Sequence, residues 1–279
     1  MPLRRHALRW TNRGRFMNAD ESQSRYGRIG ILLDLAVLHA SRVTILGQGS
    51  MGNPVAVQLV RHGVGVEAPG RIRLVDGDVV NPRNNVGTHF TESDFGENKA
   101  RAAAFMLKEI NSSAILSFWE HHLVADDLPV VMKMASESDL LCHFYDDFSV
   151  FPRLAEACYD RCIQVSAMFG PRCDYAEVAF SIPGITPPLS RTLGKRKRQS
   201  IQQPQALGTE TSLVANFVAS LCLRLLLGNA RGSELLPCYA NAPLYLVGIR
   251  NTWVFEKRAP DEILSVYCVG APTDQPQGS

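Results

Sequence analysis

The chain has 279 residues, of which 46% are hydrophobic and 20% charged, a composition typical of a globular protein large enough for one α/β domain. Its 29 lysines and arginines nearly balance 27 aspartates and glutamates, so charge gives no general case for binding nucleic acid or a membrane. The seven cysteines lack the paired spacing of a disulfide framework, and we find neither a bilayer-spanning apolar run nor a secretory signal, so we expect a cytoplasmic protein.

The first part of the chain leads into a strand. Residues 1–23 are polar without a persistent period, and we expect a poorly structured arm. Between residues 24 and 40 the apolar positions have helical spacing, which predicts a helix. The β-branched run at 43–46 then predicts the first strand.

A glycine-rich turn follows this strand and precedes a second helix. Gly47 and Gly49 allow a tight turn and a close approach of the backbone to a phosphate, and Gly52 allows the helix to pack on the strand. Unpaired amides at the start of that helix favour an anion. A second strand at 72–75 ends at Asp76, whose carboxylate is suited to ribose hydroxyls. Alone, these features predict a nucleotide site, and they suit ATP and a dinucleotide equally well.

The rest of the chain continues to alternate strands and helices. This predicts a Rossmann-like α/β fold, in which a doubly wound, mainly parallel sheet has helices on both faces. We expect strands at 114–116, 140–145 and 163–167, and helices at 100–110, 127–137 and 151–160. After Gly170 we expect a strand at 177–180 that leaves the parallel order, a mobile loop at 182–207 with a basic run at 195–198, and a long apolar helix at 209–227. Strands at 244–249 and 253–255 complete an antiparallel extension, and residues 272–279 are expected to be disordered.

The order of polar motifs along the chain is more specific than the glycine turn. It runs as Arg-Tyr-Gly-Arg at 25–28, Asp-Gly-Asp at 76–78, Asn84, Gly-Glu-Asn-Lys at 96–99, Tyr-Asp-Asp at 145–147 and Gly-Thr at 208–209. This ordered set resembles the ThiF/MoeB/HesA family, the adenylating half of ubiquitin-activating enzymes. The resemblance implies one adenylation domain over residues 24–271, with its crossover loop at about 182–207.

The resemblance also implies a reaction and its cofactors. The glycine carboxylate that ends a small ubiquitin-like or sulfur-carrier protein would attack the α-phosphorus of ATP, giving an acyl adenylate and pyrophosphate. ATP and Mg²⁺ are the implied cofactors, and a homodimer is the implied assembly. Such a transfer depends on positioning and charge neutralisation.

Individual residues receive roles by the same resemblance. Lys99 and Arg28 would balance phosphate charge, with Arg28 entering the ATP site of the other subunit. Asp146 would hold the magnesium. The remaining ATP-binding residues would be Gly47, Gly49, Gly52, Asp76 at the ribose, Asp78 bracing its loop, and Asn84 at a phosphate or ribose oxygen.

Ordinary alternatives exist for these residues, and two features depart from the family. Arg28 also fits a solvated charge at a helix start, and Asp147 is better explained as a helix cap than as a second metal ligand. Gly87 stands where the family has an arginine, three residues after Asn84, and Arg83 could substitute only if the loop takes a different path. The second half has no CxxC pair, so we expect no structural zinc.

A thioester step would need an exposed cysteine with a lowered pKa. Cys173, beside Arg172, is the least poor candidate, although an ordinary structural role is favoured. Cysteines 142, 158, 162 and 222 lie in apolar patterns and are expected in the core. Two other functions remain open: an NAD-dependent oxidoreductase, and a catalytically degenerate ThiF-like scaffold or heterodimer subunit, which the missing arginine favours.

Overall fold

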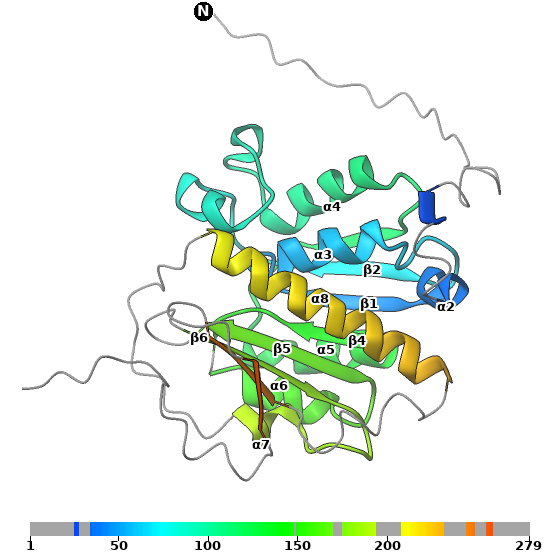
Figure 1. Cartoon of the computed structure of the whole chain (residues 1–279). Coiled ribbons are helices and arrows are strands. Elements are labelled where there is room, and N and C mark those ends of the chain that lie inside the picture. Colours follow the sequence, from blue (N-terminus) through cyan, green and yellow to red (C-terminus); the bar gives the residue numbers. More distant parts are fainter. Residues whose placement is uncertain are drawn as a thin grey trace, which may run out of the picture.

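The computed structural model describes residues 25–27, 34–147, 149–169, 175–193, 208–231, 244–248 and 255–258. The described strands form one eight-stranded sheet in the order β3-β2-β1-β4-β5-β6-β7-β8 (Figure 1). The parallel strands are β1 (Arg42–Leu46), β2 (Arg71–Val75), β3 (Leu116–Trp119), β4 (Leu140–His143) and β5 (Ile163–Phe169). The antiparallel strands are β6 (Tyr175–Ser181), β7 (Leu244–Gly248) and β8 (Phe255–Arg258). The expected mainly parallel sheet with an antiparallel C-terminal extension is confirmed.

Helices cover both faces of this sheet, as a doubly wound fold requires (Figure 1). One face carries α2 (Leu35–Ala40), α3 (Gly52–Arg61), α4 (Lys99–Ile110) and α8 (Gly208–Arg231), packed on an apolar cluster that includes Val43 and Ile45. The other face carries α5 (Leu128–Ser136), α6 (Phe151–Cys158) and α7 (Leu189–Leu193), over clusters that include Leu46 and Leu141. The described residues also include the short 3-10 helices η1 (Pro82–Gly87), η2 (Glu92–Asp94) and η3 (Ala125–Asp127). Because β1 is the middle strand of the five parallel ones, the turn that follows it projects from the centre of the parallel part of the sheet.

Helix α8 crosses the front of the sheet and packs against α3 (Figure 1). Its stretch Gly208–Gly228 is long and apolar enough to span a bilayer by length and composition, so the sequence-based statement that no such run exists is wrong. However, 67% of its apolar window is buried inside the protein. The apolarity of α8 is therefore explained by its position in the core.

Two expectations near the start of the sheet are corrected. The helix predicted over 24–40 is not continuous, because α2 begins at Leu35, where the extended residue Asp34 caps it by accepting a hydrogen bond from the Val37 amide. The strand predicted at 114–116 instead begins at Leu116 and extends to Trp119. This strand lies at the edge of the sheet, where Phe118 is 42% exposed. Because an edge strand is only partly buried, the apolar run at 114–116 does not mark its full length.

The first part of the predicted loop at 182–207 is also corrected. Residues 182–193 are ordered by packing, since Ile182 and Leu189 are buried and α7 forms there. The basic run at 195–198, the arm at 1–23 and the tail at 272–279 lie outside the described residues.

Candidate nucleotide site

In the glycine turn between β1 and α3, neighbouring atoms leave no room for a side chain at two of the three glycines, whereas the third faces open space. Gly47 has φ +91°, and a Cβ there would lie 2.6 Å from the Phe144 carbonyl oxygen. A Cβ at Gly52 would lie 1.8 Å from the Gly47 carbonyl oxygen. A Cβ at Gly49 would have no atom within 4 Å. The turn therefore needs glycine at 47 and 52 for its own geometry, while Gly49 leaves room for an anion at the start of α3.

Asp76, at the end of β2, is bonded directly to this turn. Its Oδ2 accepts a hydrogen bond from the Gln48 amide at 2.6 Å, and its Oδ1 accepts one from the Asp78 amide at 2.8 Å. Burial raises the pKa of Asp76, opposed by these two bonds. Each carboxylate oxygen retains a second lone pair that a ribose hydroxyl could use. Asp76 thus braces the glycine turn and remains chemically suited to the ribose.

Lys99 and Asp78 form an ion pair beside this carboxylate. The Lys99 side chain is only 6% exposed, and its Nζ lies 2.9 Å from Asp78 Oδ2. The Lys99 amide also donates to the Asp78 carbonyl at 2.8 Å. The structure therefore places a buried ammonium at the start of α4, where a phosphate could compete with Asp78 for it.

Asn98 joins these parts, and the sequence analysis assigned it no role. Its Oδ1 accepts from the Ala100 and Arg101 amides, which caps α4. Its Nδ2 donates to the carbonyl oxygens of Asp76 and Asp78 at 3.0 and 3.1 Å. An asparagine just before a predicted helix signals the cap, but no local pattern signals the two bonds to a strand end some twenty residues earlier.

Two aspartates follow β4 at the same edge of the sheet. Asp146 is exposed and forms no hydrogen bond with another described residue. Asp147 Oδ1 accepts from the Ser149 amide and hydroxyl at 2.8 and 2.6 Å, so it caps the turn before α6. No group of three or more metal-binding side chains occurs among the described residues. Asp146 fits the usual magnesium arrangement, in which one or two carboxylates and substrate phosphates share the ion.

Gly87, in place of the family's arginine, has a packing explanation. A Cβ at Gly87 would lie 2.7 Å from Ser50 Cβ and 3.0 Å from Thr211 Oγ1. A Cβ at Gly208 would lie 2.0 Å from the Val86 carbonyl oxygen. These two glycines allow η1 to contact both the glycine turn and the first turn of α8. A side chain at 87 would require η1 to move.

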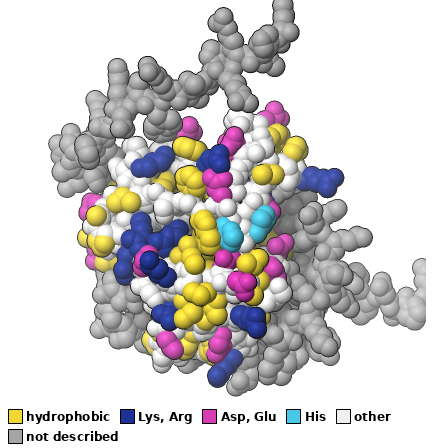
Figure 2. Space-filling model, turned by 180° about the vertical axis from the view of Figure 1, so that it is seen from behind, with side chains coloured by type: hydrophobic (Ala, Val, Ile, Leu, Met, Phe, Trp, Pro, Cys, Tyr) yellow, Lys and Arg dark blue, Asp and Glu magenta, His cyan; other side chains and the backbone are white. Residues whose placement is uncertain are grey.

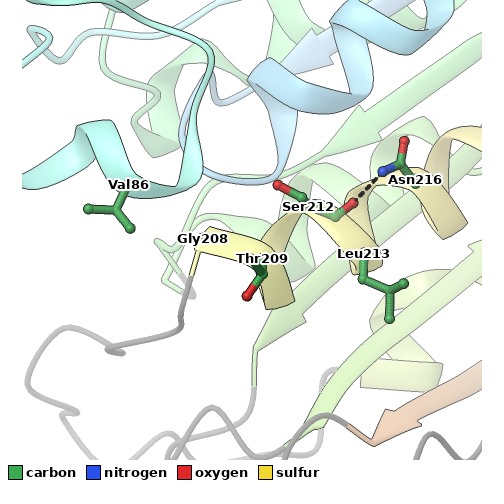
Figure 3. Close-up of a pocket in the computed structure, with 6 residues that line it drawn as sticks. All are labelled: Val86, Gly208, Thr209, Ser212, Leu213 and Asn216. Atoms are coloured by element: carbon green, nitrogen blue, oxygen red, sulfur yellow. Dashed lines mark hydrogen bonds between the residues drawn. The ribbon is translucent and has the colours of Figure 1, made fainter.

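Beside this contact lies an open hollow of about 700 Å³ (Figure 3). Its described lining comes from η1 and the first turns of α8: Val86, Gly208, Thr209, Ser212, Leu213 and Asn216. The Asn216 amide nitrogen is held by the Ser212 carbonyl, which keeps its side chain along the helix. Because η1 contacts the glycine turn, the hollow lies next to that turn, and Val86 and Leu213 make its lining partly apolar.

Several predicted residues are only partly described. Asn84 lies in η1, but its side chain is outside the described part of the structure. Arg28 and Cys173 lie outside the described residues altogether. Arg83 is exposed, with its amide donating to Asn81 Oδ1.

The described cysteines are core residues, as predicted. Cysteines 142, 158, 162 and 222 are all buried. Burial raises the pKa of Cys158 to about 11, and it also raises the pKa of Cys142 and Cys162. These thiols are therefore unsuited to act as nucleophiles.

Arg25 and Tyr26 pack at the end of α4 that lies away from Lys99. Arg25 Nη1 donates to the Ile110 carbonyl at 3.1 Å, and the buried Tyr26 hydroxyl accepts from Asn111 Nδ2 at 2.8 Å. The rise along the helix from Lys99 to Ile110 is about 17 Å. Arg25 and Tyr26 are thus anchored at the opposite end of α4 from Lys99 of the same chain.

Comparison with known proteins agrees with this architecture. Residues 23–258 match the family model described as the ThiF family. The adenylyltransferase and sulfurtransferase MOCS3 of Mus musculus is 39% identical over 95 residues, covering 32% of this chain and 20% of the relative. The adenylyltransferase and sulfurtransferase uba4 of Aspergillus niger is 32% identical over 135 residues, covering 46% of this chain and 26% of the relative. The chain therefore spans about a quarter of the length of the curated relatives that it matches.

Solved structures share the fold. Crystalline E. coli MccB matches with a TM-score of 0.70 and 20% identity, over 88% of this chain and 72% of that chain. MccB crystallised with ATP gives a TM-score of 0.69 and 22% identity, over 84% and 71% of the two chains. Selenomethionine PaaA gives 0.67 and 16% identity, over 92% and 77%. These similarities confirm the Rossmann-like α/β fold.

Proposed function

The chain belongs to the ThiF family, and from this premise we propose that it is an ATP-dependent adenylyltransferase. Its substrate is the C-terminal glycine carboxylate of a small ubiquitin-like or sulfur-carrier protein. The observation that carries the proposal is the connected set around the turn: Asp76 bonds the glycine turn, Asn98 bonds the Asp-Gly-Asp loop, and Lys99 is buried beside it. An open position at Gly49 and a buried ammonium together suit a polyphosphate.

In the proposed reaction, a carboxylate oxygen of the carrier forms a bond to the α-phosphorus, while the bond from that phosphorus to the bridging oxygen of pyrophosphate breaks. The electron pair of the broken bond leaves with pyrophosphate. Lys99 balances charge on the phosphates once they displace Asp78, and Asp76 orients the ribose. A magnesium ion at Asp146 would supply further charge neutralisation when bound.

The relatives support the nucleotide and the type of reaction. MOCS3 and uba4 are named adenylyltransferases, and MccB has been crystallised with ATP. Because the chain spans about a quarter of those curated relatives, we assign it only the adenylation step. Localisation in the cytoplasm and the absence of nucleic-acid and membrane partners remain part of the proposal.

A homodimer is the proposed assembly. Arg25 and Tyr26 are fixed near Ile110, at the end of α4 away from Lys99. We propose Arg28 for the ATP site of the other subunit on the family resemblance alone. An Arg28→Ala variant should weaken ATP binding in the dimer, and unchanged ATP affinity would contradict this role.

Pyrophosphate exchange into ATP tests the proposed function. The wild type, with magnesium and candidate carriers ending in glycine, should exchange pyrophosphate only when the correct carrier is present. Asp146→Ala and Lys99→Ala should abolish exchange. Lys108→Ala is the matched control, since this lysine lies in the last turn of the same helix and, among the described residues, donates to the Ser112 carbonyl.

The same assay, combined with direct measurement of ATP and NAD binding, separates the alternatives. ATP binding without exchange for any carrier would favour a degenerate scaffold or heterodimer subunit. Binding of NAD but not ATP would favour an oxidoreductase and would overturn the adenylation proposal.

A further inference from the structure

The two ends of η1 are held in different ways. At its start, the Val80 amide donates to the Glu97 carbonyl at 2.8 Å, so the chain enters η1 by backbone pairing with the segment before α4. At its end, the His89 amide donates at 2.7 Å to Oδ1 of Asn53, a residue in the first turn of α3. Phe90 then enters the core with 4% of its surface exposed. The exit of η1 is therefore tied to α3 by a side chain.

Asn53 connects this tie to the glycine turn. Its amide donates to the Gly49 carbonyl at 3.1 Å, so its backbone closes the turn while its side chain reaches the end of η1. The residue is fully buried, and its Nδ2 has no hydrogen-bond partner among the described residues. A buried donor without a partner destabilises a fold, so an asparagine at this position is explained by the bond that its oxygen accepts.

The cations on the other face of the sheet are engaged with carboxylates. On the face turned away from α8, lysine and arginine side chains lie beside acidic ones (Figure 2). Arg71 and Arg73 lie on the side of β2 opposite to Ile72, and their Nη2 atoms are 3.2 and 2.9 Å from Glu137 Oε2. They also lie toward the start of β2, away from the edge where the glycine turn projects. The phosphates of a nucleotide thus depend on the segments that border the turn, of which η1 is one.

We propose that Asn53 is a positioning residue for ATP, which acts by fixing η1, and with it Asn84, against the glycine turn. The inference rests on the proposed function, in which Asn84 contacts a phosphate or ribose oxygen, and it adds a residue that acts on the nucleotide only through its neighbours. The close approach of Gly87 to Ser50 brings η1 against the turn, and the bond to His89 sets where the chain leaves it. Because a small misplacement of a contacting group loses much of its effect, this bond decides how much Asn84 contributes.

The factor by which Asn84→Ala weakens ATP binding, measured at equilibrium without any carrier, tests this role. In the wild-type background the factor should be about tenfold, the scale of one hydrogen bond to a charged group. In an Asn53→Ala or Asn53→Leu background it should fall below twofold, because Asn84 is then no longer held in place. Either Asn53 variant alone should weaken ATP by a similar tenfold. Asn53→Leu keeps the size of the side chain and removes both buried polar atoms, so it should fold where the smaller alanine does not.

Three matched variants should retain the tenfold factor. Asn53→Asp keeps an oxygen that can accept from the His89 amide. His89→Ala keeps that amide and removes only the imidazole. Asn111→Ala removes another buried asparagine, at the C-terminal end of α4, where its Nδ2 donates to the Tyr26 hydroxyl and the Val60 carbonyl.

Two results would overturn the assignment while leaving the proposed function in place. One is a factor for Asn84→Ala that stays within twofold of its wild-type value in both Asn53→Ala and Asn53→Leu, which would mean that Asn53 only stabilises the fold. The other is unchanged ATP affinity in Asn84→Ala itself, since Asn53 would then have no contact to act through. If the wild type binds no ATP, the proposed function itself fails.

Discussion

Asn98 connects three parts of the site, and its replacement tests whether they act as one unit. In Asn98→Ala the cap of α4 is lost, which costs about 1 kcal/mol. The two bonds to the Asp76 and Asp78 carbonyls are also lost. Both carbonyls keep one donor, the His121 and Lys99 amides, so each lost bond costs about 0.5–1.5 kcal/mol. The free energy of unfolding should therefore fall by roughly 2–4 kcal/mol.

Asn98→Asp separates the cap from the loop contacts. An aspartate retains the capping oxygen and its charge is favourable at a helix start, but it cannot donate to either carbonyl. Urea unfolding should show a smaller loss of stability for Asn98→Asp than for Asn98→Ala, whereas ATP affinity should fall in both. Surface substitutions without structural effect usually change the free energy of unfolding by less than about 0.5 kcal/mol. If Asn98→Ala changes it by no more than this and binds ATP as the wild type does, the reasoning is refuted.

The remaining predictions concern glycines and a buried histidine. Gly52→Ala should destabilise the fold by about 1–3 kcal/mol and reduce ATP binding, because its Cβ would meet the Gly47 carbonyl at 1.8 Å, whereas Gly49→Ala should reduce ATP binding with little change in thermal stability. Gly87→Arg should lower thermal stability without raising pyrophosphate exchange, since even a Cβ there would lie 2.7 Å from Ser50; increased exchange would show that η1 can move. Burial lowers the pKa of His143 from 6.5 to about 4, so the folded state binds fewer protons between these values. The stability that this group contributes is complete above pH 6.5 and is lost as pH falls toward 4, by up to roughly 3 kcal/mol, and His143→Gln should flatten the urea-unfolding profile over that window. An equally steep profile in His143→Gln would contradict the assignment.

Much of the fold and site could be predicted from sequence because the signals are local. A β-branched run, the glycines at 47 and 52 and the acid at 76 occur within one strand-helix-strand unit, and each reflects a steric or chemical need of that unit. The alternation of strands and helices then gives the doubly wound sheet.

The parts that sequence reasoning missed depend on neighbours distant in the chain. Asn53 accepts its bond from His89, which follows it by 36 residues, and Gly87 is explained by Ser50 and Thr211, from two other elements. The error at Asp34 has another cause, since apolar spacing continues through a residue whose side chain caps the next helix. Spacing alone does not show where one helix stops and another begins.

Transfer of a labelled phosphate tests the central claim most directly. The protein is incubated with magnesium, a carrier ending in glycine, and ATP labelled at either the α- or the γ-phosphorus. We predict that the carrier acquires the α-label together with release of pyrophosphate, and that neither Lys99→Ala nor a carrier lacking its terminal glycine gives a labelled product. Transfer of the γ-label with release of ADP would identify a phosphorylating enzyme and contradict adenylation.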